Sequence, residues 1–298
     1  MATTAAPMIE AALQDRLQTH VQMLAGAIGI RNRDAYANLE AAARYIDSCL
    51  SESEYTVHRQ EIHAPDEGVV WNLEARLPGS DPEAGAIVVG AHYDSAPACP
   101  GANDNGSGVA ALLELARFHT GQKHGRAIRF VAFANEEDPH YKTPLMGSVV
   151  YAEACRQRGD RIHAMVCLET IGYYSHEPRT QAYPFPLEFF GPDTANFVAL
   201  VGNLKSRAIV TEAAAAFRET VDFPMISAAI PTWVPGASAS DHWAFWQRDY
   251  PAVMITDTAN FRYREFHTAR DTPDRLAYSD FTQVVAGISG IIAHLANS

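Results

Sequence analysis

Three short, continuous apolar segments limit the folds open to this chain more than any other feature of its sequence. They span residues 86–90, 128–134 and 164–168, and helical patterns at 107–120 and 146–158 separate them. Continuous apolar runs of this length are typical of strands buried on both faces, which need helices on either side of the sheet. The sequence therefore predicts an α/β fold, a three-layer sandwich in which helices flank a mixed, largely parallel central sheet.

The flanking segments add further elements to this core. Apolar residues at helical spacing predict two helices within residues 8–50. Alternating apolar and polar residues predict half-buried strands at 55–62 and 71–77. The remaining predicted elements are a helix around 197–217, strands at 225–230 and 252–256, and a final helix at 279–296.

The domain organisation is expected to be simple. The 298 residues contain no internal repeat, low-complexity tract or linker, so we expect one domain over 1–298 with the helices of residues 1–50 packed on it. Residues 173–192 are rich in tyrosine, phenylalanine and proline. That composition favours a long excursion rather than a core element.

Composition and charge exclude several classes of protein. Hydrophobic residues make up 47% of the chain and charged residues 19%, which is typical of a folded protein with a sizeable core. The formal net charge of -12 disfavours sequence-independent binding to nucleic acid or to an anionic membrane. The amino terminus has no basic segment followed by an apolar run, and no stretch approaches the ~18 apolar residues of a membrane span. We therefore expect a cytoplasmic protein that binds neither nucleic acid nor membranes.

The cysteine pattern restricts how this chain could hold a metal. Cys49, Cys99, Cys155 and Cys167 form no Cys-x-x-Cys pair. They indicate free thiols rather than a disulfide framework or a thiolate zinc cage. Any metal must then be bound by histidines and carboxylates.

Polar side chains that can bind metal follow the apolar strands, at the position where open α/β sheets place their ligand sites. These residues are His92 and Asp94 after the first run, Asp104 in the next loop, Glu136 and Glu137 after the second run, Glu169 after the third, and His267 near the carboxyl terminus. Each alone has an ordinary explanation, such as a core histidine, a capped turn or a solvated strand end. Together they would leave negative charge unneutralised at one edge of the sheet, so we expect cations to bind there.

These motifs closely resemble those of the two-zinc exopeptidase family that includes bacterial leucine-type aminopeptidases and, as one-zinc relatives, the glutaminyl cyclases. The resemblance extends from about Trp71 to Leu276 and rests on five ordered motifs. They are His92-Tyr-Asp-Ser, Gly101-Ala-Asn-Asp-Asn-Gly-Ser-Gly, Asn135-Glu-Glu, Ser240-Asp-His, and His267-Thr followed by Asp271-Thr-Pro-Asp. The resemblance implies the zinc exopeptidase fold and a single catalytic metallopeptidase domain.

The resemblance also implies a role for each site residue. It implies His92 and Glu169 as ligands of one zinc, Glu137 and His267 as ligands of the other, and Asp104 as the bridge. Glu136 corresponds to the general base. Asp94, two residues after His92, is placed to accept the second N–H of that imidazole and so to fix its orientation.

This ligand set has a clear chemical purpose. Two zinc ions ~3.5–4 Å apart can share a water, lower its pKa toward ~7 and polarise a scissile carbonyl. Glu136 can take the proton of that water and pass it to the leaving amine. The sequence thus predicts an exopeptidase with two zinc ions and a metal-bridging hydroxide, most simply an aminopeptidase that acts on peptides or amino-acid amides.

Two positions depart from the family pattern. Glu169 stands where the aminopeptidases usually carry aspartate, so the space around the first zinc must differ. Phe266 cannot donate a hydrogen bond, which leaves Tyr173, Tyr174 and Tyr263 as candidate donors to an oxyanion. A separate question is whether aromatic residues wall a substrate pocket or only pack in the core. These aromatic residues lie at 173–190 and at Trp233, Trp243 and Trp246.

Several alternatives remain open at the level of sequence. Glu169 favours a carboxypeptidase or an N-acyl-amino-acid amidohydrolase. A glutaminyl cyclase is disfavoured by His92, since the second zinc site is intact. A non-catalytic binding module is disfavoured because no ligand and no base is missing. A serine hydrolase is weaker still, since Gly106-Ser-Gly lacks the spacing of a nucleophile elbow.

Overall fold

The amino-terminal part of the chain forms the two predicted helices. The computed structural model describes residues 5–64, 68–183 and 191–298. Helix α1 (Ala5–Val21) runs into a π-helical turn (Gln22–Ile28), and helix α2 (Tyr36–Glu52) follows a short 3-10 turn. Asn32 caps that turn, because its side chain accepts hydrogen bonds from the backbone N–H groups of Asp34 and Ala35.

A single sheet organises the described residues. Its eight strands lie in the order β1-β2-β4-β3-β5-β8-β6-β7. They are β1 (Val57–Ala64), β2 (Gly68–Leu77), β3 (Ala86–His92), β4 (Ala127–Phe133), β5 (Ile162–Glu169), β6 (Val198–Gly202), β7 (Met225–Ala229) and β8 (Ala252–Thr256). The central pairs β4/β3, β3/β5 and β5/β8 are parallel, while β1/β2, β2/β4 and β6/β8 are antiparallel. The prediction of a mixed, largely parallel sheet is confirmed.

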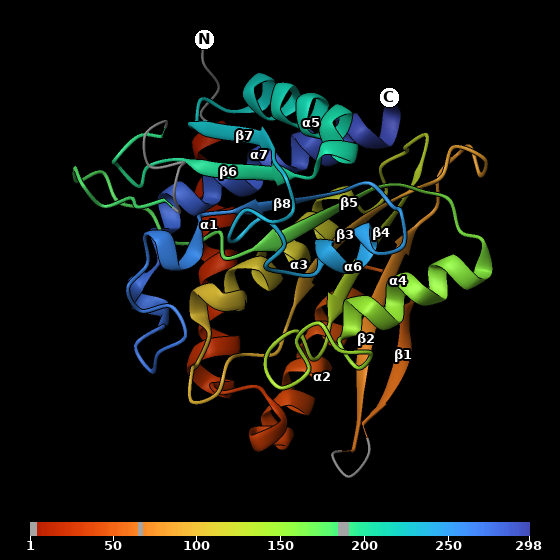
Figure 1. Cartoon of the computed structure of the whole chain (residues 1–298), viewed down its shortest axis with the longest axis horizontal. Helices are drawn as coiled ribbons and strands as arrows, with labels where there is room; N and C mark the ends of the chain where they lie inside the picture. The colour runs from red at the N-terminus through yellow and green to blue at the C-terminus, as the bar shows by residue number, and fades with distance from the viewer. Residues whose placement is uncertain (1–4, 65–67, 184–190) are drawn as a thin grey trace.

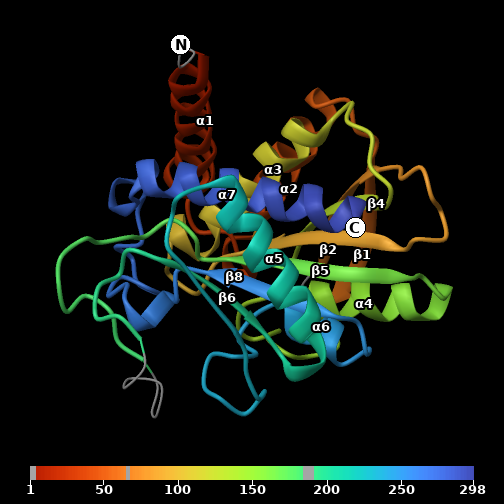
Figure 2. The ribbon, with the colours of Figure 1, turned by 90° about the horizontal axis from the view of Figure 1, so that it is seen from above.

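Helices cover both faces of the sheet, which makes three layers. One face carries α1, α2, α3 (Gly108–His119), α5 (Arg207–Thr220) and α7 (Tyr278–Asn297). The other carries α4 (Gly147–Arg158) and α6 (His242–Trp246), as Figures 1 and 2 show. Along β3, Ile87 and Val89 pack into the first core while Val88 packs into the second. Burial on both faces explains why the central strands read as continuous apolar runs.

One predicted helix was wrong in its first part. Residues 198–202 form strand β6, between β8 and β7, and the helix begins only at Arg207. The turn between them is capped by Asn203, whose side-chain oxygen accepts from the Ser206 backbone N–H at 2.9 Å. A short apolar run next to a helical pattern does not distinguish a strand from a helix. Here the segment is a strand because it pairs with β7 and β8.

The described part of the chain also bears on three other expectations. Residues 184–190 of the predicted 173–192 excursion lie outside the described residues, and the described remainder forms neither helix nor strand. All four cysteines are free, as predicted. Among the helices of the described residues, none has the length and apolar character that crossing a membrane requires.

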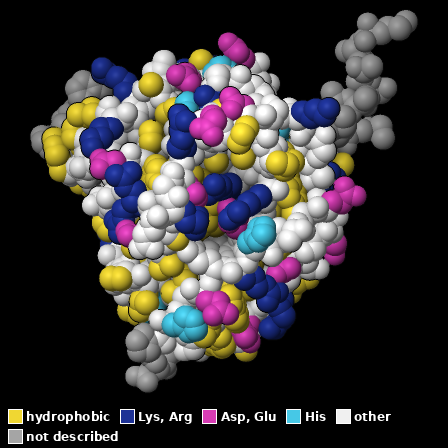
Figure 3. Space-filling view, turned by 90° about the vertical axis from the view of Figure 1, so that its right-hand side faces the viewer, with side chains coloured by type: hydrophobic (Ala, Val, Ile, Leu, Met, Phe, Trp, Pro, Cys, Tyr) yellow, Lys and Arg dark blue, Asp and Glu magenta, His cyan; other side chains and the backbone are white. Residues whose placement is uncertain are grey.

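The parallel strands place their carboxyl ends on one side of the molecule. His92 ends β3, Glu169 ends β5, and Glu136 and Glu137 follow β4 after a short turn. Figure 3 looks onto the side away from these ends, where basic, acidic and hydrophobic side chains are interspersed. The metal-capable residues therefore gather at one edge of the sheet, as expected for an open α/β fold.

Candidate metal centre

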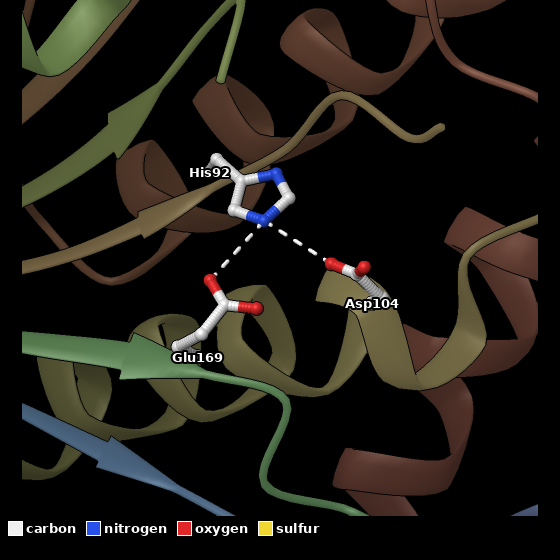
Figure 4. Close-up of side chains that lie close together, drawn as sticks. All are labelled: His92, Asp104 and Glu169. Carbon is white, nitrogen blue, oxygen red and sulfur yellow. Dashed lines mark ion pairs between the residues drawn. The ribbon is translucent and has the colours of Figure 1, made fainter. Parts of the chain in front are cut away.

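Three side chains from separate segments meet at the end of β3. His92 Nε2 lies 3.2 Å from Asp104 Oδ1 and 3.3 Å from Glu169 Oε2. Figure 4 shows the three side chains pointing toward one another. All three are buried, and one ligand atom from each lies within 4.8 Å of the others. This group could hold a metal ion.

A second group shares one residue with the first. His267 Nε2 lies 2.8 Å from Asp104 Oδ2 and 3.3 Å from Glu137 Oε1. The two oxygens of Asp104 therefore face different groups. The His267 side chain is 44% exposed and its ring stacks on Phe266 at 3.9 Å, so the second group lies nearer to solvent.

The loop that carries Asp104 is held from several directions. Gly101 has φ +65°, and a Cβ atom there would lie 2.4 Å from the carbonyl oxygen of Asp104, so only glycine fits. The Asp271 carboxylate accepts hydrogen bonds from the backbone N–H groups of Asn103 at 2.8 Å and Asp104 at 3.0 Å. Tyr263 donates to the same carboxylate at 3.0 Å. The Asp271 motif thus positions the shared carboxylate.

Asp94 lies beside His92 but makes its hydrogen bonds elsewhere. Its oxygens accept from the backbone N–H groups of Glu136 at 3.1 Å and Glu137 at 2.9 Å. Its distance to His92 Nδ1 is 3.6 Å, which is longer than a hydrogen bond. In this structure Asp94 fixes the backbone of the two glutamates rather than the imidazole.

Glu136 is close to the centre without belonging to either three-residue group. Its Oε2 lies 3.8 Å from His92 Nε2, and the side chain is buried. The neighbouring Glu137 contributes to the second group instead. Consecutive residues after a strand point in different directions, so one carboxylate can bind metal while the other faces the reacting atoms.

Burial and mutual repulsion disturb the protonation of this cluster. Burial raises the pKa of Glu137 to about 7, and it raises the pKa values of Glu136 and Glu169 as well. Burial alone would lower the pKa of His267, but the carboxylates of Asp104 and Glu137 raise it to about 10. So many buried carboxylates are electrostatically costly unless positive charge neutralises them.

The residues fit zinc by their chemistry and by their unsatisfied atoms. Asp104 Oδ1 and Glu137 Oε1 are buried and accept no hydrogen bond from the described residues. Each group offers one imidazole nitrogen and two carboxylates, a donor set that suits zinc. Among the described residues, each of the two groups that share Asp104 could therefore hold a metal ion.

One close partner of the centre, Ser240, is not marked as such by the sequence. Ser240 Oγ donates a 2.6 Å hydrogen bond to Glu169 Oε2. The Ser-Asp-His motif marked this segment as near the site, but nothing in its spacing identified the contact. His242 lies outside both groups, and its Nε2 is 2.8 Å from the carbonyl of Ala237.

The aromatic residues divide into packed and accessible ones. The Tyr174 and Tyr263 hydroxyls donate to Ile171 O and to Asp271, so neither is free to serve an oxyanion. Trp246 is buried in the core, whereas Trp233 is 75% exposed. Tyr141, which no sequence motif marks, follows Glu136 in the same loop, and burial together with Glu136 raises the pKa of its hydroxyl.

Comparisons with known proteins identify the family to which this chain is similar. Residues 72–292 match the family described as Peptidase family M28. An Escherichia coli (strain K12) protein described as uncharacterized protein YfbL is 37% identical over 293 residues, which are 95% of this chain and 88% of that protein. The Saccharomyces cerevisiae probable aminopeptidase YDR415C is 22% identical over 241 residues, which are 76% of this chain and 58% of that protein.

Solved structures share the fold. The Legionella pneumophila LapA aminopeptidase has a TM-score of 0.73 at 20% identity, over 99% of this chain and 76% of that one. The Tannerella forsythia glutaminyl cyclase has a TM-score of 0.70 at 20% identity, over 94% of this chain and 98% of that one. At these identities the likeness supports the fold and not a particular substrate.

Proposed function

This chain belongs to peptidase family M28 and is a metallopeptidase, and from that premise we propose that it is an aminopeptidase that works with two zinc ions per chain. The proposal includes one catalytic domain over residues 1–298. Its substrates are peptides or amino-acid amides with a free amino terminus.

The observation that carries the proposal is the position of Asp104. One of its oxygens faces His92 and the other faces His267, at 3.2 Å and 2.8 Å. A glutamate completes each group, Glu169 in the first and Glu137 in the second. A carboxylate with its two oxygens turned to two such groups is the arrangement that a pair of metal ions needs.

The residues divide the catalytic work among them. Zinc bound here would polarise the scissile carbonyl and lower the pKa of the attacking water. Glu136 takes the proton of that water and delivers it to the leaving amine. Asp94 keeps Glu136 in place, because it holds the backbone N–H groups of Glu136 and Glu137.

The choice of an aminopeptidase rests on the relatives. YDR415C is described as a probable aminopeptidase and LapA as an aminopeptidase. A carboxypeptidase or an N-acyl-amino-acid amidohydrolase is the second candidate, which Glu169 favours because its longer side chain narrows the space for a substrate amine. A glutaminyl cyclase is third, and a non-catalytic binding module is last because the base and all five predicted metal ligands are present.

The test is a substrate panel with the zinc-loaded chain. Leucyl and phenylalanyl peptides and arylamides are compared with the same compounds acetylated at the amino terminus, and products are identified by mass spectrometry. The proposal expects release of the amino-terminal residue from the free compounds only. Cleavage confined to the acetylated compounds would instead support the second candidate.

A further inference from the structure

The loop that follows Glu137 forms an ordered rim beside the metal centre. It joins β4 to α4, and it is held by hydrogen bonds from His140 N to Glu137 O at 3.0 Å and from Thr143 Oγ1 to His140 O at 2.7 Å. Within it, Lys142 adopts φ +56°, a left-handed conformation that is uncommon for a lysine. Unusual backbone of this kind concentrates at functional sites.

Two segments far apart in the sequence hold the Lys142 ammonium. Its Nζ lies 3.3 Å from Ser238 Oγ, 5.0 Å from the centre of the Tyr141 ring and 5.2 Å from the centre of the Trp243 ring. Tyr141 also reaches across, since its hydroxyl lies 3.4 Å from the carbonyl oxygen of Ser238. The aromatic rings attract the cation and restrict the motion of a side chain that is otherwise flexible.

The Lys142 ammonium lacks a counterion in the described part of the chain. Its polar contact there is the Ser238 hydroxyl, which uses one of three N–H donors. The chain has 35 acidic residues against 23 basic ones, so an unpaired, half-buried lysine is not explained by a shortage of carboxylates. Two donors and a full positive charge are left for a ligand.

The position of Lys142 indicates which part of a substrate it meets. Lys142 follows Glu136 in the loop after β4, and its partner Ser238 lies two residues before Ser240, which donates to Glu169 Oε2 at the first group. Burial lowers the pKa of Lys142, while Glu136 raises it. In the proposed mechanism Glu136 delivers a proton to the leaving amine. The leaving residue should therefore lie beside the loop that carries both Glu136 and Lys142.

We propose that Lys142 binds the free α-carboxylate of the residue that is released, so that dipeptides are the preferred substrates. In a dipeptide this carboxylate is separated from the leaving nitrogen by one carbon. In a longer peptide a neutral amide takes its place, and the attraction between opposite charges is lost. This inference rests on the proposed peptidase function and adds a substrate class to it.

The experiment compares leucylglycine with leucylglycinamide, which share the scissile bond and differ in the carboxylate. We measure kcat/KM for both with the wild type, Lys142→Met, Lys142→Arg and, as a control, Lys123→Met. Methionine removes the charged nitrogen but keeps an unbranched side chain with the same Cβ atom, so the backbone conformation is not further strained. Lys123 is an exposed lysine in the turn before β4, at the opposite edge of the sheet.

The wild type is expected to prefer leucylglycine. Lys142→Met should lower the ratio of kcat/KM for leucylglycine over leucylglycinamide by about tenfold, mainly through KM, because a charge-assisted contact is removed. Lys142→Arg should restore most of the ratio, and Lys123→Met should not change it. A second readout is the Kd of both compounds for Glu136→Gln, with and without Lys142→Met, measured by calorimetry.

The possible results distinguish a failure of the proposed role of Lys142 from a failure of the proposed peptidase function. If the wild type cleaves both compounds and Lys142→Met lowers both equally or neither, the lysine has a structural role and the inference is overturned while the peptidase stands. If the zinc-loaded wild type cleaves neither these compounds nor any of the peptides in the panel above, the proposed function fails and the inference fails with it.

Discussion

The Ser240 hydroxyl donates a 2.6 Å hydrogen bond to Oε2 of Glu169, the same oxygen that faces His92 Nε2 at 3.3 Å. Both residues are buried, so the contact is shielded from water. It fixes the rotamer of a side chain that is one methylene longer than the aspartate usual at this position. Ser240 therefore determines the position of the Glu169 carboxylate in the first group.

Ser240→Ala should weaken zinc binding at the first group. A residue that orients a metal ligand is commonly worth 10- to 100-fold in metal affinity, so we expect a loss of roughly tenfold. Competition with a chromogenic chelator measures the affinity. The matched control is Ser206→Ala, another buried serine, whose hydroxyl accepts from Ala252 N at the far end of the sheet. Equal zinc affinity in the wild type and Ser240→Ala would show that the hydrogen bond does not orient the ligand.

Glu169→Asp should move the specificity of the enzyme toward free amino termini. Aspartate withdraws the carboxylate by one methylene, which leaves more room for the substrate amine beside the first group and breaks the contact with Ser240. The substrate panel measures kcat/KM for free and acetylated compounds in both proteins. A wild type that already cleaves leucyl arylamide rapidly, with no change in the variant, would make Glu169 a neutral replacement.

Glu136→Gln should separate catalysis from metal binding. Glutamine keeps the shape of the side chain but cannot accept a proton, so turnover should fall roughly 10²–10⁴-fold while zinc content stays at the wild-type level. The adjacent Glu137→Gln is the matched comparison, and it should lose zinc from the second group. Full turnover in Glu136→Gln would mean that another residue is the base.

A buried histidine pair away from the centre should make stability depend on pH. His119 Nδ1 lies 3.2 Å from His124 Nε2, and His119 Nε2 lies 3.3 Å from Ser289 Oγ on α7. Burial, with a smaller contribution from His124, lowers the pKa of His119 to about 4. Between that value and about 6.5, the pKa of an unfolded histidine, the unfolded chain binds a proton that the folded chain does not.

The free energy of unfolding should therefore decrease as the pH falls below about 6.5, with a slope of up to ~1.4 kcal/mol per pH unit from His119. Urea unfolding from about pH 7.5 to about pH 5 measures it. His119→Gln should flatten this part of the curve, while His294→Gln, at an exposed position on α7, should not. Identical slopes in the wild type and His119→Gln would contradict the assignment.

The sequence predicted the architecture well because its strongest signals are local. Continuous apolar runs at β3, β4 and β5 reflect burial on both faces of the sheet, and this pattern does not depend on the conformation of the loops. Strand β6 was missed because its five residues lead directly into a helical pattern. Only pairing with β8 and β7 makes that segment a strand.

The candidate site was less completely predictable, for a physical reason. The metal-capable residues follow strands, so topology brings them together. The contacts of Ser240 and Lys142 depend on the paths of irregular loops, which no periodic pattern encodes. Asp94 shows the same limit. Its position beside His92 was predicted from the sequence, but its hydrogen bonds to the backbone of Glu136 and Glu137 were not.

The most direct test of the account is the number of zinc ions per chain. Metal-free protein is titrated with zinc by calorimetry, and the zinc retained after gel filtration is measured by elemental analysis. The account predicts about two equivalents for the wild type and about one each for His92→Ala and His267→Ala, because each histidine serves one of the groups that share Asp104. One equivalent or less in the wild type, with peptide hydrolysis indifferent to a chelator, would contradict it.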